Sequence, residues 1–321
     1  MRAITLNDFE SGAALRDVPD LEPGASEIRV RVHTSSLNPY DFFVANGLAK
    51  GMMEYDFPVT VGADFAGVVD KVGEEVSRYS VGDEVFGFVS TPPTLKLGTW
   101  AEYLVVPEDM FVAAKPANAT MLEAGALGIA ATAALTAVEA IDPQPGETVL
   151  IVGATGGVGG YALQLAAARG AAVIATSRAE DEERLRGYGA ADTIDYKKTD
   201  VAATVRDRYH DGVKGLIDTV NQTEGLNAMA ELVADGGHVA SPLAQLDPDE
   251  LAKRNVTATF VMASPAPDRL TAVAEQVDAG NLKVPIQSVH PLDGTLDAFE
   301  EKAQQGTHGK LALAIVEPDE D

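Results

Sequence analysis

The residues with the clearest chemical potential form a glycine-dense stretch at positions 153–160. It follows a β-branched and aliphatic run at 148–152 and leads into an alanine- and leucine-rich segment that predicts a helix. Glycines allow a backbone to approach a pyrophosphate, and the N–H groups and dipole at a helix N-terminus favour its negative charge. Ala154, Gly156 and Gly159 hold the three positions of the fingerprint G-x-G-x-x-G. The stretch therefore predicts a binding site for a dinucleotide.

The choice of dinucleotide depends on the end of the next predicted strand, about 20 residues further on. A carboxylate there usually holds the ribose 2′-hydroxyl of NAD, but this strand ends in Ser177 and Arg178. A hydroxyl beside a guanidinium suits a 2′-phosphate, which predicts NADP(H). The alternative is that Arg178 is a solvated residue at a helix start, since an acidic run follows at 180–183.

Composition and charge narrow the classes of function. The chain has 49 acidic and 24 basic residues, and its net charge of −25 opposes binding to nucleic acids or anionic membranes. Such a charge destabilises a compact fold unless salt screens it, so we expect a halophilic protein from a salt-rich cytoplasm; the alternative is an ordinary acidic protein. No cysteine is present, which excludes disulfides, cysteine nucleophiles and thiolate zinc sites. The sequence has no bilayer-spanning apolar run and begins with a strand pattern, so we expect a cytoplasmic protein.

The elements that would position these residues fall into two groups, as two domains do in a chain of 321 residues. Up to about residue 115 the chain is rich in short strands, such as the alternating run at 28–33, and predicts a partly open barrel or sandwich. Beyond an alanine-rich helix, six strands alternate with helices, as a doubly wound dinucleotide-binding sheet requires. These strands are expected at 149–152, 172–176, 193–195, 216–220, 238–241 and 257–262. Helices at 269–279 and near 296–303 and a closing strand at 310–316 follow.

Several motifs, in order along nearly the whole chain, resemble those of the medium-chain dehydrogenase/reductase superfamily, in its zinc-free quinone oxidoreductase (zeta-crystallin-like) branch. Besides the glycine turn they are NPYD at 38–41, PVTVGADFAGVV at 58–69, VGDEVFG at 81–87, GTWAEY at 98–103, TAAL at 132–135, GAAD at 189–192 and GKLAL at 309–313. The resemblance implies an α/β fold. A GroES-like, β-rich catalytic domain would be split into residues 1–117 and 264–321, with an inserted doubly wound Rossmann domain at 118–263. It also implies NADP(H) as cofactor and a homodimer or homotetramer.

The same resemblance bears on metal binding. Zinc-dependent members of the superfamily hold their catalytic metal with a Cys, a His and a further Cys or acidic ligand. Asn38, Ala63 and Gly128 stand at these positions here, and the four-cysteine structural lobe is missing, so the resemblance implies no zinc. Without a Lewis acid, a quinone or enone accepts hydride more easily than an isolated carbonyl, because its conjugated system spreads the charge.

Two residues in the first motif are candidates for catalysis. Tyr40 lies where zinc relatives often carry a proton-relay hydroxyl, so it could polarise the acceptor oxygen or donate a proton. Alternatively, Tyr40 is a pocket wall and water delivers the proton. Asn38 could bind the acceptor or the nicotinamide ribose, or it could form an Asx turn before Pro39. Asp41 is expected to be the N-cap of the helix that follows.

The motifs also imply the contacts of the cofactor. Thr132 would lie near the nicotinamide, and Ser177, Arg178 and Tyr196 would bind the adenosine phosphate, unless Tyr196 is a surface aromatic at a strand end. The implied set is Thr132, Ala154, Thr155, Gly156, Gly157, Val158, Ser177, Arg178, Tyr196, Asn221, Ser241, Phe260 and Val261. The strand that carries Phe260 and Val261 could instead pair across a dimer interface.

The sequence thus predicts a zinc-independent, NADPH-dependent reductase that transfers hydride to a quinone or another conjugated carbonyl or activated alkene. This activity is of the NADPH:quinone oxidoreductase or alkenal/enone reductase type. Two alternatives stay open. One is an enoyl reductase for acyl thioesters, whose phosphate-bearing carrier this acidic chain would repel; the other is a catalytically silent NADP(H)-binding protein with a structural or sensing role. We expect a small-molecule substrate and no nucleic-acid or membrane partner.

Overall fold

The computed structural model describes residues 1–90, 93–299 and 308–316, and the chain divides into two compact units. Unit 1 comprises Met1–Thr132, Ser264–Asp278 and Val284–Asp321, and unit 2 comprises Ala133–Ala263 and Ala279–Lys283. The domain boundaries expected at 117/118 and 263/264 stay a prediction, and part of the helix expected near 296–303 lies outside the described residues.

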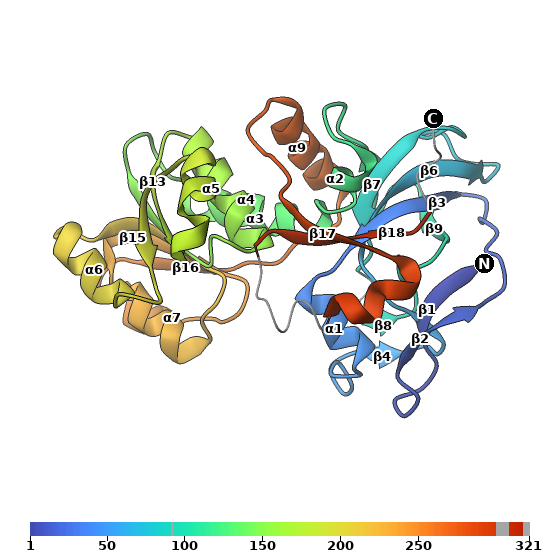
Figure 1. The fold of residues 1–321 in the computed structure, drawn as a ribbon, viewed down its shortest axis with the longest axis horizontal. Helices are drawn as coiled ribbons and strands as arrows, with labels where there is room; N and C mark the ends of the chain where they lie inside the picture. The colour runs from blue at the N-terminus through green and yellow to red at the C-terminus, as the bar shows by residue number, and fades with distance from the viewer. Residues whose placement is uncertain (91–92, 300–307, 317–321) are drawn as a thin grey trace. The chain divides into compact units, whose positions relative to one another are not determined.

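Unit 1 is built mainly from β-strands (Figure 1). They are β1 Arg2–Leu6, β2 Ala13–Asp17, β3 Glu27–Ser36, β4 Glu54–Tyr55, β5 Val59–Thr60, β6 Asp64–Val72, β7 Glu84–Phe88, β8 Thr94–Leu95, β9 Tyr103–Pro107, β10 Val112–Ala114, β17 Ile286–Pro291 and β18 Lys310–Ala314. The largest sheet has the order β10-β7-β6-β3-β18-β17, with β9 also paired to β3. A second sheet has the order β2-β1-β5, and β4 pairs with β8. The predicted closing strand is therefore confirmed as β18, which runs antiparallel to the end of β3.

The described part of unit 1 contains the helices α1 Pro39–Ala45, α2 Met121–Ala124, the first turn of α3 Gly128–Ile141, α9 Pro267–Asp278 and the 3-10 turn Leu292–Gly294. Residues 295–299 are also helical, as expected for the start of the helix near 296–303. The remainder of α3 belongs to unit 2. Within the residues that the structure describes, no helix combines the length and apolarity needed to cross a bilayer.

Strand β3 organises the core of unit 1. Its alternating pattern places Ile28, Val30 and Val32 on one face, and all three are fully buried in a cluster with Phe65 and Trp100. Burial of each such side chain stabilises the fold by about 1.5–3 kcal/mol. The predicted amphipathic strand is thus confirmed.

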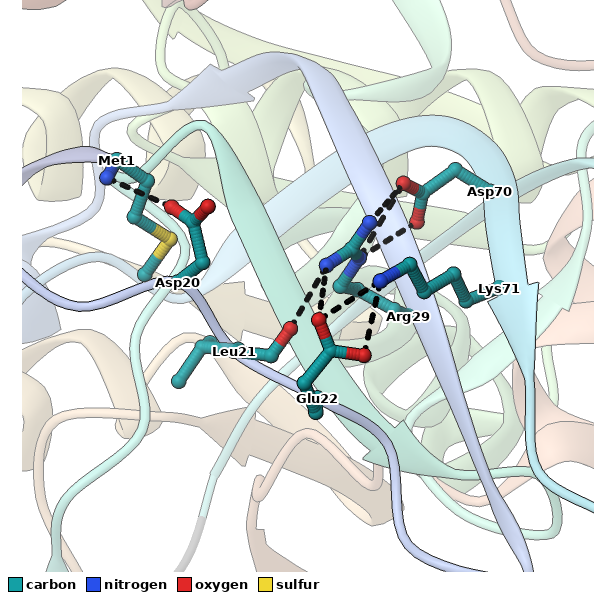
Figure 2. A network of polar contacts seen from close by, with 7 residues as sticks. All are labelled: Met1, Asp20, Leu21, Glu22, Arg29, Asp70 and Lys71. Atoms are coloured by element: carbon teal, nitrogen blue, oxygen red, sulfur yellow. Dashed lines mark hydrogen bonds and ion pairs between the residues drawn. The ribbon is translucent and has the colours of Figure 1, made fainter.

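The other face of β3 carries charges instead of apolar groups (Figure 2). Arg29 Nε donates to Asp70 Oδ1 at 2.9 Å, and its guanidinium lies 4.6 Å from the centroid of the Tyr103 ring. Glu22 accepts from Lys71 Nζ at 2.7 Å and lies 3.4 Å from Arg29 Nη1. The network connects the loop before β3 to strands β3 and β6, because its charged groups come from all three segments.

Unit 2 contains the predicted parallel sheet, and this confirms the fold class. Its strands are β11 Thr148–Val152, β12 Ala172–Ser177, β13 Ala190–Asp195, β14 Val213–Asp218, β15 Val233–Ser241 and β16 Thr257–Phe260, in the order β13-β12-β11-β14-β15-β16. All neighbours are parallel. Between them lie α4 Gly157–Ala168, the 3-10 turn Ala179–Asp181, α5 Glu182–Gly187, α6 Val201–Arg208, α7 Thr223–Ala230 and α8 Pro248–Ala252. The strand order reverses beside β11, the point at which such sheets bind ligands.

Three strands end earlier than predicted: two in this sheet, and β18, which ends at Ala314 and not at residue 316. Strand β14 stops at Asp218, not at residue 220, because the hydroxyl and N–H of Thr219 both turn to the carbonyl of Val152, at 2.9 and 3.1 Å. Strand β16 stops at Phe260, and its four residues are exposed at one end of the sheet order. An exposed edge suits pairing with a second chain, but the dimer or tetramer stays a prediction.

We expect alanine at Gly62 to destabilise the fold more than alanine at Gly82, because only at Gly62 would the added Cβ collide with another side chain. The two share a left-handed φ, +95° and +99°, but a Cβ at Gly62 would lie 2.2 Å from Trp100 Cδ1, whereas one at Gly82 would meet nothing within 4 Å. Gly82→Ala should lower the free energy of unfolding by about 1–2 kcal/mol, and Gly62→Ala by about 1–3 kcal/mol more. Urea unfolding followed by the emission of Trp100, the single tryptophan, measures both. Equal losses in the two variants would contradict the packing seen around Gly62.

Salt should stabilise this chain. With a net charge of −25, we expect self-repulsion to outweigh the exposed ion pairs, and salt screens both. The screening length falls from about 10 Å at 0.1 M to about 3 Å at 1 M ionic strength. We therefore expect the melting temperature to rise between these two KCl concentrations, as measured by circular dichroism. A melting temperature that falls with KCl would show that attractive pairs dominate.

Candidate functional site

The glycine turn of unit 2 forms a cradle at the start of α4. Gly156 is the N-cap of this helix, and the first turn carries no acidic residue. A Cβ at Gly159 would lie 2.2 Å from the carbonyl oxygen of Gly153, so only glycine allows the turn to close. A Cβ at Gly156 would meet only that same oxygen, at 3.6 Å, so the backbone there is open to a ligand. Because the first N–H groups of a helix lack intrahelical partners, this cradle fits the pyrophosphate of a dinucleotide.

Two threonines at the ends of the strands on either side of β11 hold the glycine turn in place by hydrogen bonds. Thr176 Oγ1, on β12, accepts from the N–H of Gly153 at 3.0 Å. Thr219, directly after β14, bonds to the carbonyl of Val152 on β11. The predicted residues Thr155, Gly157 and Val158 are partly exposed around the turn, whereas Ala154 is buried beneath it.

Asp218 is a residue of this region that the sequence analysis missed. Its carboxylate is fully buried at the end of β14 and accepts from the N–H groups of Val220 and Asn221, at 3.0 and 2.9 Å. It also accepts from Asn221 Nδ2 at 2.7 Å. The amide nitrogen of the predicted cofactor residue Asn221 is therefore directed at Asp218. An acidic residue at the carboxyl end of a buried strand was the sequence feature that could have revealed it.

Three predicted residues meet at the ends of β12 and β13. Arg178 Nε donates to Tyr196 Oη at 3.1 Å, and the N–H of Tyr196 donates to the carbonyl of Ser177 at 3.2 Å. This hydrogen bond to Tyr196 raises the pKa of the Arg178 guanidinium. Ser177 is 1 % exposed, whereas Tyr196 is 42 % exposed. The pair thus presents a cation and a phenol at the surface, next to the strand end that was predicted to hold a 2′-phosphate.

The acidic run beside Arg178 is partly neutralised. Asp181 accepts from Arg184 at 2.6 Å, and Glu182 accepts from Arg186 at 2.9 Å. Glu180 lies 3.7 Å from Arg178 itself. Two of the acids therefore have other cations as partners, which lowers their repulsion of a phosphate at Arg178.

The remaining predicted cofactor residues lie elsewhere. Ser241 and Phe260 are opposite each other at the ends of β15 and β16, and the N–H of Val261 donates to the carbonyl of Ser241 at 2.9 Å. Ser241 and Val261 are buried, and Phe260 is exposed. Thr132 is buried in α3, where its hydroxyl donates to the carbonyl of Gly128 at 2.8 Å.

In unit 1, the candidate catalytic residue Tyr40 is the second residue of α1. The helix starts at Pro39, whose fixed φ suits a first helical position, and Asn38 is its N-cap. The prediction that Asp41 is the N-cap is therefore wrong. Asp41 is the third helical residue, and its carboxylate accepts from the N–H of Asn38 at 2.6 Å, as in a capping box.

Tyr40 lies in an apolar environment. It packs against a cluster that contains Val44, Val59 and Leu95. Burial, and then the charge of Asp41, raise the pKa of the Tyr40 phenol to about 12, against the effect of a hydrogen bond with Ser90. The phenol is therefore neutral at physiological pH and can donate a hydrogen bond, while the raised pKa means that it holds its proton more tightly than an exposed tyrosine does.

Asn38 belongs to a buried polar cluster, which we call the Asp64 cluster and which consists of Ser36, Asn38, Asp64 and Lys310. Asn38 Nδ2 donates to Asp64 Oδ2 at 2.8 Å, and Asn38 Oδ1 accepts from Lys310 Nζ at 2.7 Å. Ser36 Oγ and Lys310 Nζ also donate to Asp64 Oδ2, at 2.6 and 3.2 Å. Both ends of the Asn38 amide are thus bonded within the protein. Asp64 and Lys310 were missed as site residues, although each is a charge inside an apolar run.

The three positions aligned with zinc ligands converge on this cluster. Asn38 is part of it, Ala63 precedes Asp64 and is fully buried, and a Cβ at Gly128 would lie 2.1 Å from Asp64 Oδ1. Across residues 1–90, 93–299 and 308–316, no group of three or more His, Cys, Asp or Glu side chains could hold a metal ion.

Comparison with known proteins agrees with this geometry. Residues 24–117 match the family described as alcohol dehydrogenase GroES-like domain, and residues 188–313 match the family described as zinc-binding dehydrogenase. The chain is 29% identical over 336 residues to a chloroplast envelope quinone oxidoreductase homolog of Arabidopsis thaliana, with 99% of this chain and 98% of the relative covered.

Two further similarities extend over nearly the whole chain. A 2-methylene-furan-3-one reductase of Solanum lycopersicum is 30% identical over 325 residues, with 98% of this chain and 79% of the relative covered. A solved structure of an NAD-dependent alcohol dehydrogenase superposes with a TM-score of 0.86 at 29% identity, covering 98% of this chain and 100% of that one. The β-rich unit with its inserted parallel sheet, and these matches from end to end, show that the chain belongs to the medium-chain dehydrogenase/reductase superfamily, in its quinone oxidoreductase branch, whose members bind NAD(P)H.

Proposed function

We propose that this oxidoreductase is a zinc-independent, NADPH-dependent reductase of quinones or other conjugated carbonyl compounds. The observation that carries the proposal is the neutral phenol of Tyr40, a proton donor held among apolar side chains. The similarity to a chloroplast envelope quinone oxidoreductase homolog and to a 2-methylene-furan-3-one reductase supports the same class of acceptor.

The chain's own residues would bind the cofactor at its phosphates. The cradle at Gly156 would receive the pyrophosphate, and Arg178 with Tyr196 would receive a 2′-phosphate. Bound NADPH supplies the hydride. Arg178 would exchange its exposed partner Glu180 for the phosphate oxygens and keep its hydrogen bond to Tyr196, because a guanidinium has five N–H donors.

Tyr40 would act on the acceptor oxygen. As negative charge builds up on that oxygen, a neutral phenol can donate a hydrogen bond and then its proton. Its apolar surroundings strengthen that interaction, because the local dielectric constant is low. A conjugated acceptor suits this arrangement, since its charge is spread and one phenol suffices to stabilise it.

Replacing Tyr40 by phenylalanine tests the proton role. We expect Tyr40→Phe to lower kcat about 100-fold with p-benzoquinone or cyclohexenone, while KM changes little. In the wild type, kcat should show no titration of this phenol between about pH 6 and pH 9, because its pKa is about 12. Steady-state NADPH oxidation across this pH range measures both.

Tyr55→Phe is the matched control, because Tyr55 packs on the same apolar cluster and its hydroxyl donates to the carbonyl of Val44, at 3.3 Å. Turnover by Tyr40→Phe equal to that of the wild type at every pH would make Tyr40 a pocket wall. No turnover by the wild type with any acceptor, despite NADPH binding, would favour a silent binding protein.

Replacing Arg178 tests the choice of cofactor. Loss of a charged hydrogen bond to a phosphate costs about 1.5–3 kcal/mol, so Arg178→Ala should weaken NADPH binding about 10- to 100-fold and leave NADH binding unchanged. Arg208→Ala is the control, because Arg208 is similarly exposed but pairs with Asp192, which is not part of the acidic run beside Arg178. Fluorescence titration of each coenzyme gives the dissociation constants. A wild type that prefers NADH would overturn the assignment of Arg178.

A further inference from the structure

We propose that Lys310 is a positioning residue for Tyr40, and this inference rests on the proposed function. Its buried ammonium holds residues 37 and 38 and so fixes the first turn of α1, on which Tyr40 lies. The hydrogen bonds of Lys310 Nζ go to Leu37, Asn38 and Asp64, so Lys310 acts on Tyr40 through the chain segment before the helix.

Lys310 reaches this segment through strand pairing. Strand β18 runs antiparallel to β3, with Ala312 opposite Ser36, and the N–H of Leu37 donates to the carbonyl of Leu311 at 2.9 Å. Continuing this register places Lys310 opposite Asn38, although 272 residues separate them in the sequence. The pairing of β18 with β3 therefore places Lys310 beside the N-cap of α1.

The Lys310 ammonium is buried, and its hydrogen-bonding capacity is used within the Asp64 cluster and by the Leu37 carbonyl. The Lys310 side chain is 4% exposed and that of Asp64 is 0% exposed. Lys310 Nζ has three acceptors within reach, namely Asn38 Oδ1 at 2.7 Å, Asp64 Oδ2 at 3.2 Å and the Leu37 carbonyl at 3.4 Å. An ammonium has three N–H donors, so this acceptor set matches its whole capacity.

Asp64 holds the lysine in turn and connects it to a second helix. Its other oxygen, Oδ1, accepts from the N–H of Ile129 in the first turn of α3, at 2.8 Å. The approach is possible because residue 128 is glycine, since a Cβ there would lie 2.1 Å from Oδ1. One carboxylate therefore fixes both the start of α3 and, through Lys310 and Asn38, the start of α1.

The fixed orientation of Asn38 determines the position of Tyr40, which lies two residues further along the chain. Its amide is bonded at both ends and its backbone N–H is bonded to Asp41, so the residue has one available orientation. Pro39 follows with a fixed φ, and Tyr40 is next. Loss of the ammonium would free Asn38 Oδ1 and let this first turn move. A displacement of about 1 Å at a proton donor can cost about 100-fold in rate.

The test is Lys310→Ala with chemical rescue. The substitution removes the atoms of an n-propylammonium ion, so this ion is the rescuing reagent and n-propanol is its uncharged control, at constant KCl. We expect kcat for p-benzoquinone to fall about 10- to 100-fold, with NADPH affinity unchanged because the phosphate cradle is in unit 2. n-Propylammonium should restore part of kcat and n-propanol none.

Lys115→Ala is the matched variant. Lys115 is largely shielded from solvent, with its side chain 10% exposed and paired with Glu84, and it donates to the carbonyls of Pro116 and Ala119. It should show neither the loss of kcat nor the rescue. Full kcat in Lys310→Ala, or the same loss in Lys115→Ala, would overturn the proposal.

A double-mutant cycle separates positioning from other roles. If Lys310 acts through Tyr40, Lys310→Ala should change kcat less than about twofold in the Tyr40→Phe background. Fully additive losses would overturn the proposed route through Tyr40. If Lys310→Ala fails to fold, Lys310→Met combined with Asp64→Asn removes both charges, and wild-type kcat in that variant would overturn the proposal.

Amide hydrogen exchange tests the proposal without turnover. The amides of α1 should exchange faster in Lys310→Ala than in the wild type or Lys115→Ala, and n-propylammonium should slow them again. Unchanged α1 exchange would overturn the positioning role. A wild type that binds NADPH but reduces no acceptor would refute the proposed function alone, and the exchange result would still decide on Lys310.

Discussion

The architecture of the candidate catalytic unit depends on the burial of one carboxylate. An ionised Asp64 without contact to solvent is tolerable only if donors replace the water it has lost. The protein supplies these donors from Ser36 at the end of β3, Asn38 at the cap of α1, Lys310 on β18 and the first turn of α3. Because each donor comes from a different element, satisfying this charge also determines where those elements end.

The coenzyme unit solves a similar problem with backbone groups. Its glycine turn offers N–H donors at the start of α4, and the buried carboxylate of Asp218, at the end of β14, binds the N–H groups of the loop that follows. A cradle of main-chain donors tolerates many side chains, whereas the Asp64 cluster needs particular ones. Substitutions in the two units should therefore differ in their consequences: affinity for coenzyme in one, and rate with the acceptor in the other.

The sequence predicted local features well and distant ones poorly. The six parallel strands were predictable because each is a short apolar run between turn residues. The predicted end of β14 and the predicted N-cap of α1 were wrong. Thr219 and Asn38 form the hydrogen bonds that set these two positions, and a hydrophobic pattern does not reveal such bonds. The contact between Asp64 and Lys310 was missed altogether. It spans 246 residues and exists only because β18 pairs with β3, a choice that no local pattern specifies.

The close approach of Asp64 to position 128 has an evolutionary consequence. Any side chain at Gly128 would collide with Asp64 Oδ1. If Asp64 moved away, the buried Lys310 ammonium would lose its carboxylate partner. A change at one of these three positions is therefore expected to destabilise the fold unless the others change with it. Such epistasis would favour the joint inheritance of lysine, aspartate and glycine at these positions.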